Sequence, residues 1–226
     1  MARATDRLLA TVDGFSDADV RAPSGLPGWT RAHVLTHVAR NADAVANLAH
    51  WARTGEERPM YAGGAAGRDA AIEEGAARHI GDLRLDIDES AERLLAAFTG
   101  FSAEGLAREV EGMRGARFVG WELPQIRLRE VEIHHLDLDA GYTSADWSPA
   151  FAARTLDTVA PAFLARGDCP VSALHDTEGG VWQVGAAGPT LSGPTPELAA
   201  WLVGRSDGAA LRPSPPGVVP TAPRWI

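Results

Sequence analysis

The segment RAHVLTHVARNADAVANLAHWAR, residues 31–53, predicts one long amphipathic helix. Thr30 precedes it as a plausible N-cap, and Gly55 follows it as a stop signal. Its apolar side chains recur every three or four residues, which places them along one helix face: Val34, Leu35, Val38, Ala42, Val45 and Leu48. A stripe of this length needs other helices to cover it.

Three further helices are predicted in the first part of the chain. Residues 4–12 form a short helical pattern that Gly14 interrupts. Residues 68–98 carry a second long amphipathic pattern, with irregularity expected near two internal glycines, Gly75 and Gly81.

Residues 121–139 predict the fourth helix, with Pro124 near its start and Gly141 as its left-handed C-cap. Residues 21–28 read as a loop, and the glycine-rich stretch 100–120 reads as irregular. Four helices joined mostly by short connections are typical of a helical bundle.

The pattern changes after Ser144, and we place a domain boundary between residues 143 and 144. A helix at 149–166 precedes two strand-like runs, at 171–175 and 181–184. The later segments are a helix at 196–203 and an extended proline-rich end at 212–225. The expected fold class is therefore α+β, with a helical bundle at 1–143 and a small α+β domain at 144–226.

Composition limits the classes of function. The chain has 226 residues, 45% of them hydrophobic, and a formal net charge of -9, which opposes a nucleic-acid partner. No apolar run approaches the roughly 20 residues that cross a bilayer, so no membrane association is expected. The single cysteine, Cys169, cannot form an internal disulfide, and we expect a cytoplasmic protein.

The clearest chemical pattern is REVEIHHLD at residues 129–137. On a helix, Glu130 and His134 lie one turn apart on the same face and can chelate one ion, with Asp137 following at i+3. Such a pair alone is commonly a surface hydrogen bond. Here the face is partly apolar, and burying ionisable groups there is costly unless they are paired or bind a metal.

A second pair of histidines lies on the first long helix. His33 is in the first turn, near the exposed end of the helix, whereas His37 is one turn deeper beside apolar positions. We therefore favour His37 as the third ligand. Two imidazoles and one carboxylate leave a coordination position for water or substrate, which is typical of catalytic sites.

Three segments together carry a family resemblance: GWTRAHVLTHVARN at 28–41, REVEIH at 129–134 and WLVGR at 201–205. They resemble the mycothiol-dependent maleylpyruvate isomerase family over nearly the whole chain. The resemblance implies a DinB-like four-helix bundle followed by a small α+β C-terminal domain. It also implies that His37, Glu130 and His134 are the metal ligands, that the metal is a divalent ion, usually zinc, and that Asp137 is a polar group beside them.

The resemblance further implies a reaction. Family members convert the cis double bond of maleylpyruvate to the trans bond of fumarylpyruvate in gentisate breakdown, with mycothiol as the thiol cofactor. A metal-bound thiol loses its proton near neutral pH, and addition of the thiolate gives a single bond that rotates before elimination. By the same resemblance, Arg205 projects toward the metal site and holds a carboxylate or the developing enolate. Cys169 has no adjacent histidine and is read as incidental.

Two alternatives stay open at the level of sequence. Another mycothiol S-transferase or detoxification enzyme would use the same ligands with a different acceptor pocket. A non-enzymatic metal-binding regulatory module is the second alternative, and it would be expected to supply an additional cysteine ligand. The predicted partners are mycothiol and a small-molecule substrate, and the sequence does not distinguish among oligomeric states.

Overall fold

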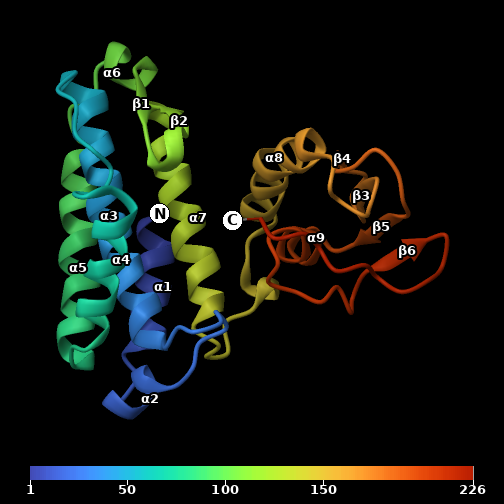
Figure 1. Cartoon of the computed structure of the whole chain (residues 1–226), viewed down its shortest axis with the longest axis horizontal. Helices are drawn as coiled ribbons and strands as arrows, with labels where there is room; N and C mark the ends of the chain where they lie inside the picture. The colour runs from blue at the N-terminus through green and yellow to red at the C-terminus, as the bar shows by residue number, and fades with distance from the viewer. Residues whose placement is uncertain (226) are drawn as a thin grey trace. The chain divides into compact units, whose positions relative to one another are not determined.

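The computed structural model describes residues 1–225 and divides the chain into two compact units, Met1–Ala140 and Gly141–Ile226. The sequence placed the boundary between residues 143 and 144. Figure 1 shows a helical N-terminal unit, coloured blue to green-yellow, and a mixed C-terminal unit, coloured yellow to red. The expected α+β fold class is confirmed.

Four helices form the bundle of the N-terminal unit: α1 (Ala2–Val12), α3 (Arg31–Thr54), α5 (Ile80–Ala97) and α7 (Leu123–Asp137). Helices α1 and α3 each pack against both α5 and α7 (Figure 1). The core between them includes Leu8, Leu35, Ile87 and Val131, all fully buried. Burial of these four apolar faces together stabilises the bundle.

The ends of α3 follow from local sequence. At its start, the backbone N–H of Thr30 donates to Nδ1 of His33, with the two nitrogens 3.2 Å apart. At its end, Gly55 adopts a φ of 83°, the left-handed conformation that glycine adopts without steric cost. The prediction of a helix at 31–53 is confirmed, with one more residue at its C-terminus.

The prediction of one continuous helix across 68–98 is wrong, although the break lies between Gly75 and Gly81, where the sequence predicts irregularity. The segment forms two helices, α4 (Gly64–Ala76) and α5, separated at residues 77–79. Contacts from the distant helix α2 (Asp17–Arg21) stabilise the break. Arg21 donates to the carbonyl oxygens of Ala77 and Arg78 at 2.8 and 2.7 Å, and the Asp17 carboxylate accepts the N–H of Ile80 at 2.8 Å. The local pattern contains no sign of these capping contacts.

The stretch 100–120 is also more regular than predicted. It contains helix α6 (Ala103–Ala107), strands β1 (Glu109–Glu111) and β2 (Arg117–Val119), and short 3-10 turns η1 (Met113–Gly115) and η2 (Gly120–Glu122). The two strands pair antiparallel. Strands of three residues are too short to show an alternating pattern in the sequence.

The end of α7 corrects the expected C-cap. The helix stops at Asp137, Leu138 is its C-cap, and Asp139 is the first residue with a left-handed φ, at 49°. Gly141 has a φ of 90° but lies beyond the cap. An aspartate tolerates the left-handed conformation better than most side chains do, so the helix ends before the glycine.

The C-terminal unit packs helices α8 (Pro149–Arg166) and α9 (Thr195–Leu202), together with the 3-10 turn η3 (Ser144–Asp146), with a four-stranded sheet. The strand order is β4-β3-β5-β6, and β3 pairs parallel to β5 with Leu174 opposite Leu191. The strands are β3 (Ala173–Asp176), β4 (Val181–Gln183), β5 (Thr190–Gly193) and β6 (Arg212–Ser214). The sequence predicted α8, α9, β3 and β4 but missed β5.

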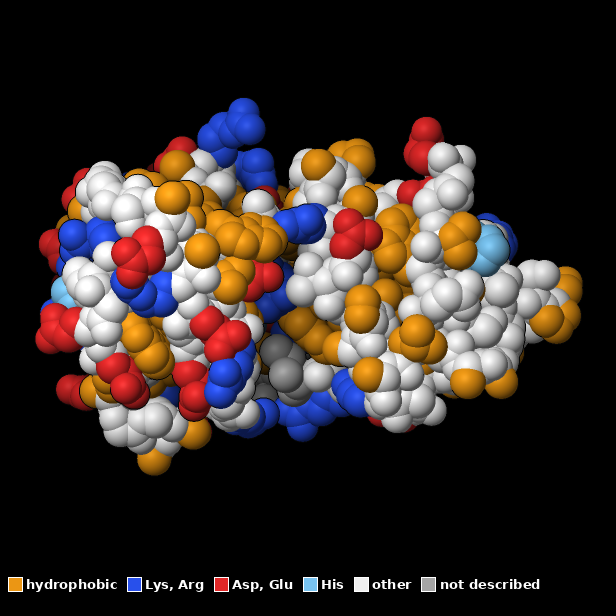
Figure 2. Space-filling model, turned by 90° about the horizontal axis from the view of Figure 1, so that it is seen from above, with side chains coloured by type: hydrophobic (Ala, Val, Ile, Leu, Met, Phe, Trp, Pro, Cys, Tyr) orange, Lys and Arg blue, Asp and Glu red, His pale blue; other side chains and the backbone are white. Residues whose placement is uncertain are grey.

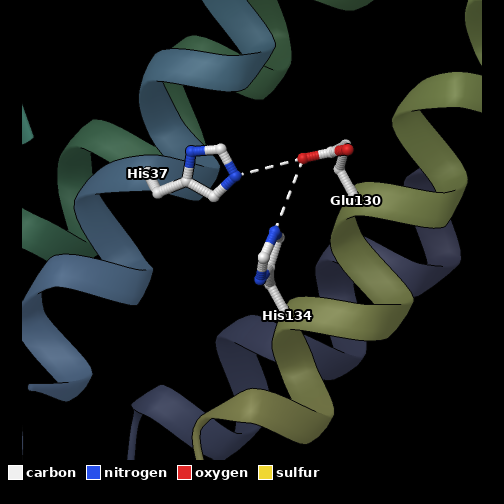
Figure 3. A group of neighbouring side chains, drawn as sticks. All are labelled: His37, Glu130 and His134. Carbon is white, nitrogen blue, oxygen red and sulfur yellow. Dashed lines mark hydrogen bonds and ion pairs between the residues drawn. The ribbon is translucent and has the colours of Figure 1, made fainter. Parts of the chain in front are cut away.

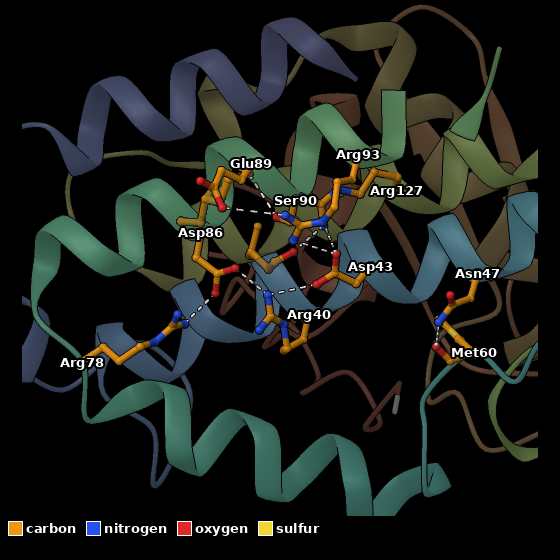
Figure 4. A network of polar contacts seen from close by, with 12 residues as sticks. Arg40, Asp43, Asn47, Met60, Arg78, Asp86, Glu89, Ser90, Arg93 and Arg127 are labelled. Atoms are coloured by element: carbon orange, nitrogen blue, oxygen red, sulfur yellow. Dashed lines mark hydrogen bonds and ion pairs between the residues drawn. The ribbon is translucent and has the colours of Figure 1, made fainter. Parts of the chain in front are cut away.

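A network of ion pairs links α3, the break between α4 and α5, and α5 itself (Figure 4). Asp86 of α5 accepts from Arg40 at 2.5 Å and from Arg78 at 2.6 Å, and Asp43 accepts from Arg93 at 2.9 Å.

On the face in Figure 2, acidic and basic side chains are interspersed over the N-terminal unit. In the part of the chain that is described, no helix has the length and apolar character needed to span a bilayer.

We predict that Gly75→Ala destabilises the bundle. A Cβ at Gly75 would lie 2.3 Å from Cγ2 of Thr36, a residue of α3 that is 1% exposed and has little room to move. The expected loss in the free energy of unfolding is about 1–2 kcal/mol, since the clash outweighs the helix preference of alanine.

The matched control is Gly81→Ala in α5, where an added Cβ meets nothing within 4 Å. Alanine there should raise the free energy of unfolding by up to about 1 kcal/mol. Urea unfolding measures both variants. Equal stability of the two would contradict close packing of α4 on α3.

Candidate metal centre

Helices α3 and α7 bring three ionisable side chains together in the interior of the bundle (Figure 3). Nε2 of His37 lies 3.1 Å from Oε2 of Glu130, and Nε2 of His134 lies 3.5 Å from the same oxygen. One ligand atom from each residue lies within 4.8 Å of the other two. We call His37, Glu130 and His134 the triad.

The triad is largely shielded from water. The side chains of His37, His134 and Glu130 are 5%, 13% and 20% exposed. The imidazole of His37 packs edge-on against that of His134, with ring centroids 4.5 Å apart, and against Trp29 at 5.7 Å. A buried carboxylate between two rings needs compensation from positive charge or from a cation.

Burial and mutual contact separate the pKa values of the two histidines. Burial lowers the pKa of His37 to about 4, and the nearby positive charge of His134 adds to the effect. Burial also opposes the charge on His134, but hydrogen bonds to Asp137 and Glu130 outweigh it and raise its pKa to about 9. Glu130 is buried as well, yet its hydrogen bonds to His134 and His37 hold its pKa well below the ordinary value.

The triad has the donor set and the spacing of a divalent-metal site. Two imidazole nitrogens and one carboxylate oxygen are ligands that zinc accepts. A tetrahedral site with bonds of about 2.0–2.2 Å has edges of about 3.3–3.6 Å. The distances from Oε2 of Glu130 to the two histidine nitrogens are 3.1 and 3.5 Å, and all three ligand atoms lie within 4.8 Å of one another. Three protein ligands leave a fourth position for a bound molecule, so the residues fit an open metal centre.

Asp137 lies where it can orient one of the ligands. Its Oδ2 is 2.8 Å from Nδ1 of His134, on the side of the ring away from Glu130. A carboxylate at that nitrogen fixes the tautomer and leaves Nε2 as the ligand atom. Asp137 is 2% exposed, which strengthens this contact.

Three other histidines of the N-terminal unit have different partners. The ring of His33 caps α3 through Nδ1, and its Nε2 lies 3.4 Å from Glu73. His50 pairs with Glu56 at 3.0 Å, and His79 pairs with Asp17 at 3.1 Å. The structure thus brings His37, and not His33, to Glu130 and His134.

Two residues named from the sequence belong to the C-terminal unit. Arg205 follows α9, where its Nη1 donates to the carbonyl oxygen of Val203 at 2.9 Å. Cys169 is buried near the start of the sheet, and burial raises the pKa of its thiol. A buried thiol with a raised pKa is a poor nucleophile, in keeping with its interpretation as incidental.

The sequence did not single out Arg68 and Tyr61, which surround the triad on the α4 side. Nη2 of Arg68 lies 3.4 Å from Nδ1 of His37, and burial raises the pKa of Tyr61, whose phenol lies close enough to Glu130 and Arg68 for their charges to shift that pKa in opposite directions. No motif contains these two residues. Their location depends on the packing of α4 against α3, which no local pattern encodes.

Fold and site together define a class of protein: helical bundles in which a His-Glu-His group at the interior has the donors to hold a divalent ion. Residues 1–139 match the family model described as the mycothiol maleylpyruvate isomerase N-terminal domain. The chain belongs to this family.

Comparison with solved structures gives two matches to one enzyme. They are crystal structures of the mycothiol-dependent maleylpyruvate isomerase and of a histidine-to-alanine mutant of it. Each is 29% identical in sequence to this chain, with a TM-score of 0.91. Each match covers 99% of this chain and 93% of the chain in the crystal structure. The resemblance inferred from the three sequence segments is confirmed. Among curated proteins, no relative matches the chain.

The pKa values predict how metal affinity depends on pH. With a pKa of about 9, His134 carries a proton at neutral pH, whereas His37, with a pKa of about 4, is already neutral. Binding through Nε2 of His134 therefore releases one proton, so zinc affinity should rise about tenfold per pH unit between pH 6 and 8.

A competition titration with a chelator of known affinity at each pH measures this slope. Above about pH 9 the slope should flatten, because His134 is then neutral before the ion binds. Zinc affinity that does not change between pH 6 and 8 would contradict the assignment of His134 as a ligand.

Proposed function

We propose that this protein is a mycothiol-dependent isomerase that converts maleylpyruvate to fumarylpyruvate. The observation that carries the proposal is the convergence of His37, Glu130 and His134 within 4.8 Å inside the bundle. Membership of the family and the structural likeness to a mycothiol-dependent maleylpyruvate isomerase over 99% of the chain support it.

In this proposal the triad holds a divalent ion, with zinc as the expected metal. Such an ion lowers the pKa of a thiol bound to it, so that the nucleophilic thiolate is available near neutral pH. Glu130 contributes the negative charge of the site, and Asp137 holds the ring of His134 in the orientation that points Nε2 toward Glu130.

The remaining task of the protein is to bind and orient the substrate. Cis–trans conversion changes no oxidation state, so the chain needs no redox group. Maleylpyruvate carries carboxylates, and arginine is the side chain best suited to hold them through paired, charge-assisted hydrogen bonds.

We assign this role in part to Arg205. Its backbone N–H donates to the carbonyl oxygen of Ala200 at 2.7 Å, and Gly204 before it has a φ of 73°. These features fix the turn that presents the arginine after α9. The family resemblance in the segment WLVGR, residues 201–205, is the other support for this role.

The regulatory-module alternative finds less support than the enzyme. A thiol-responsive metal site would need a cysteine ligand, and the one cysteine of the chain, Cys169, belongs to the C-terminal unit and not to the triad. A mycothiol S-transferase would use the same triad, so the substrate assay below separates it from an isomerase.

We predict that the zinc-loaded protein isomerises maleylpyruvate only when mycothiol is added. The fall in maleylpyruvate absorbance and the appearance of fumarylpyruvate measure turnover. Zinc-free protein is the control. Isomerisation without any thiol would contradict the mechanism, and stable attachment of mycothiol to an electrophile in place of isomerisation would indicate a transferase.

We also predict that Arg205→Lys keeps its zinc but loses at least about tenfold in kcat/KM, because lysine cannot form the paired contact to a carboxylate. Arg154→Lys, on the exposed side of α8, is the matched control and should retain activity. Wild-type activity of Arg205→Lys would show that arginine is not required at this position.

A further inference from the structure

The two histidines of the triad differ in what faces their second ring nitrogen. Nδ1 of His134 has a hydrogen-bond acceptor, the Asp137 carboxylate, at 2.8 Å. Nδ1 of His37 instead faces Nη2 of Arg68 at 3.4 Å. One ring has a partner that suits a metal ligand, and the other has a cation.

This difference matters because of the protons that each group carries. A neutral imidazole that ligates an ion through Nε2 carries its proton on Nδ1 and must donate it. The guanidinium of Arg68 has donors only and accepts nothing. When His37 acts as a ligand, two donors therefore face each other, and an acceptor is needed beside both.

The surroundings of Arg68 leave its guanidinium able to bind a further anion. It lies over the ring of Trp29, 5.9 Å from the centroid, and close to the phenol of Tyr61, neighbours that hold it beside the triad. Its carboxylate partner is Asp69, at 2.7 Å, whose side chain is 66% exposed. An exposed pair of this kind contributes little free energy and gives way readily to a better-placed anion.

We propose that Arg68 is a substrate-binding residue, and that a carboxylate of the substrate lies beside the two groups and accepts from both the Arg68 guanidinium and the Nδ1–H of His37. One carboxylate oxygen accepts from the imidazole and the guanidinium donates to the same group. The inference rests on the proposed function for the identity of the substrate. It assigns to the N-terminal unit a carboxylate contact separate from that of Arg205.

The test measures equilibrium binding with no thiol and no turnover. Maleate is the probe, and its neutral diamide is the reference ligand without carboxylates. Calorimetry on the zinc-loaded protein gives the Kd of each probe, and metal analysis gives the zinc content. The variants are Arg68→Gln, which removes the charge, and Arg68→Lys, which keeps the charge without the fork.

The expected result is specific to charge and position. Arg68→Gln should bind maleate at least about tenfold more weakly, with full zinc content and an unchanged Kd for the diamide. Arg68→Lys should have a Kd for maleate between those of the wild type and Arg68→Gln. Asp69→Asn, which removes the competing carboxylate, should bind maleate as tightly as the wild type or more tightly.

The matched control is Arg93→Gln. Arg93 also pairs with a carboxylate, Asp43, at 2.9 Å, but on α5, among the ion pairs that link α5 to α3, and its side chain is 50% exposed. The Arg93→Gln variant should have the same Kd for maleate as the wild type.

Three results would overturn the inference. Arg68→Gln could bind maleate within about twofold of the wild type, which would mean that a water molecule serves as the acceptor. The variant could weaken maleate and diamide equally, or it could lose its zinc, which would make Arg68 a support for His37. Because no turnover is measured, loss of the isomerase proposal would leave a positive binding result standing.

Discussion

Placing one carboxylate between two imidazoles in the interior of a bundle constrains the rest of the N-terminal unit. A buried, unpaired Glu130 would cost several kcal/mol, so its contacts to His37 and His134 must form when the helices pack. His37 is on α3, whereas Glu130 and His134 are on α7. The relative height and rotation of these two helices are therefore fixed by polar contacts as well as by the apolar core.

Contacts around the triad hold the same two helices in place. Arg127 lies one turn before Glu130 on α7, is 1% exposed, and donates to the carbonyl oxygen of Val38 at 2.7 Å and to Asn41 at 2.9 Å. On the other side, Gly75 lets α4 approach α3 closely. The apolar side chains of α3 thus stabilise the bundle, and a polar position of the same helix, His37, contributes to the triad.

Much of this could be predicted from the sequence, because the helices and the i, i+4 pair Glu130–His134 are local patterns. His37 could be preferred over His33 because it lies one turn deeper in the helix. Irregularity near Gly75 and Gly81 could be predicted, but the complete break between α4 and α5 could not, since its stabilising partners Asp17 and Arg21 are distant in sequence. The place of Arg68 beside His37 depends on the same long-range packing.

The most direct test of the account is a crystal structure of the zinc-loaded protein, with anomalous diffraction measured on either side of the zinc absorption edge. The account predicts one strong anomalous peak at about 2.0–2.2 Å from Nε2 of His37, an Oε atom of Glu130 and Nε2 of His134. A peak bound by other residues, or a fully loaded protein with no peak at the triad, would contradict it.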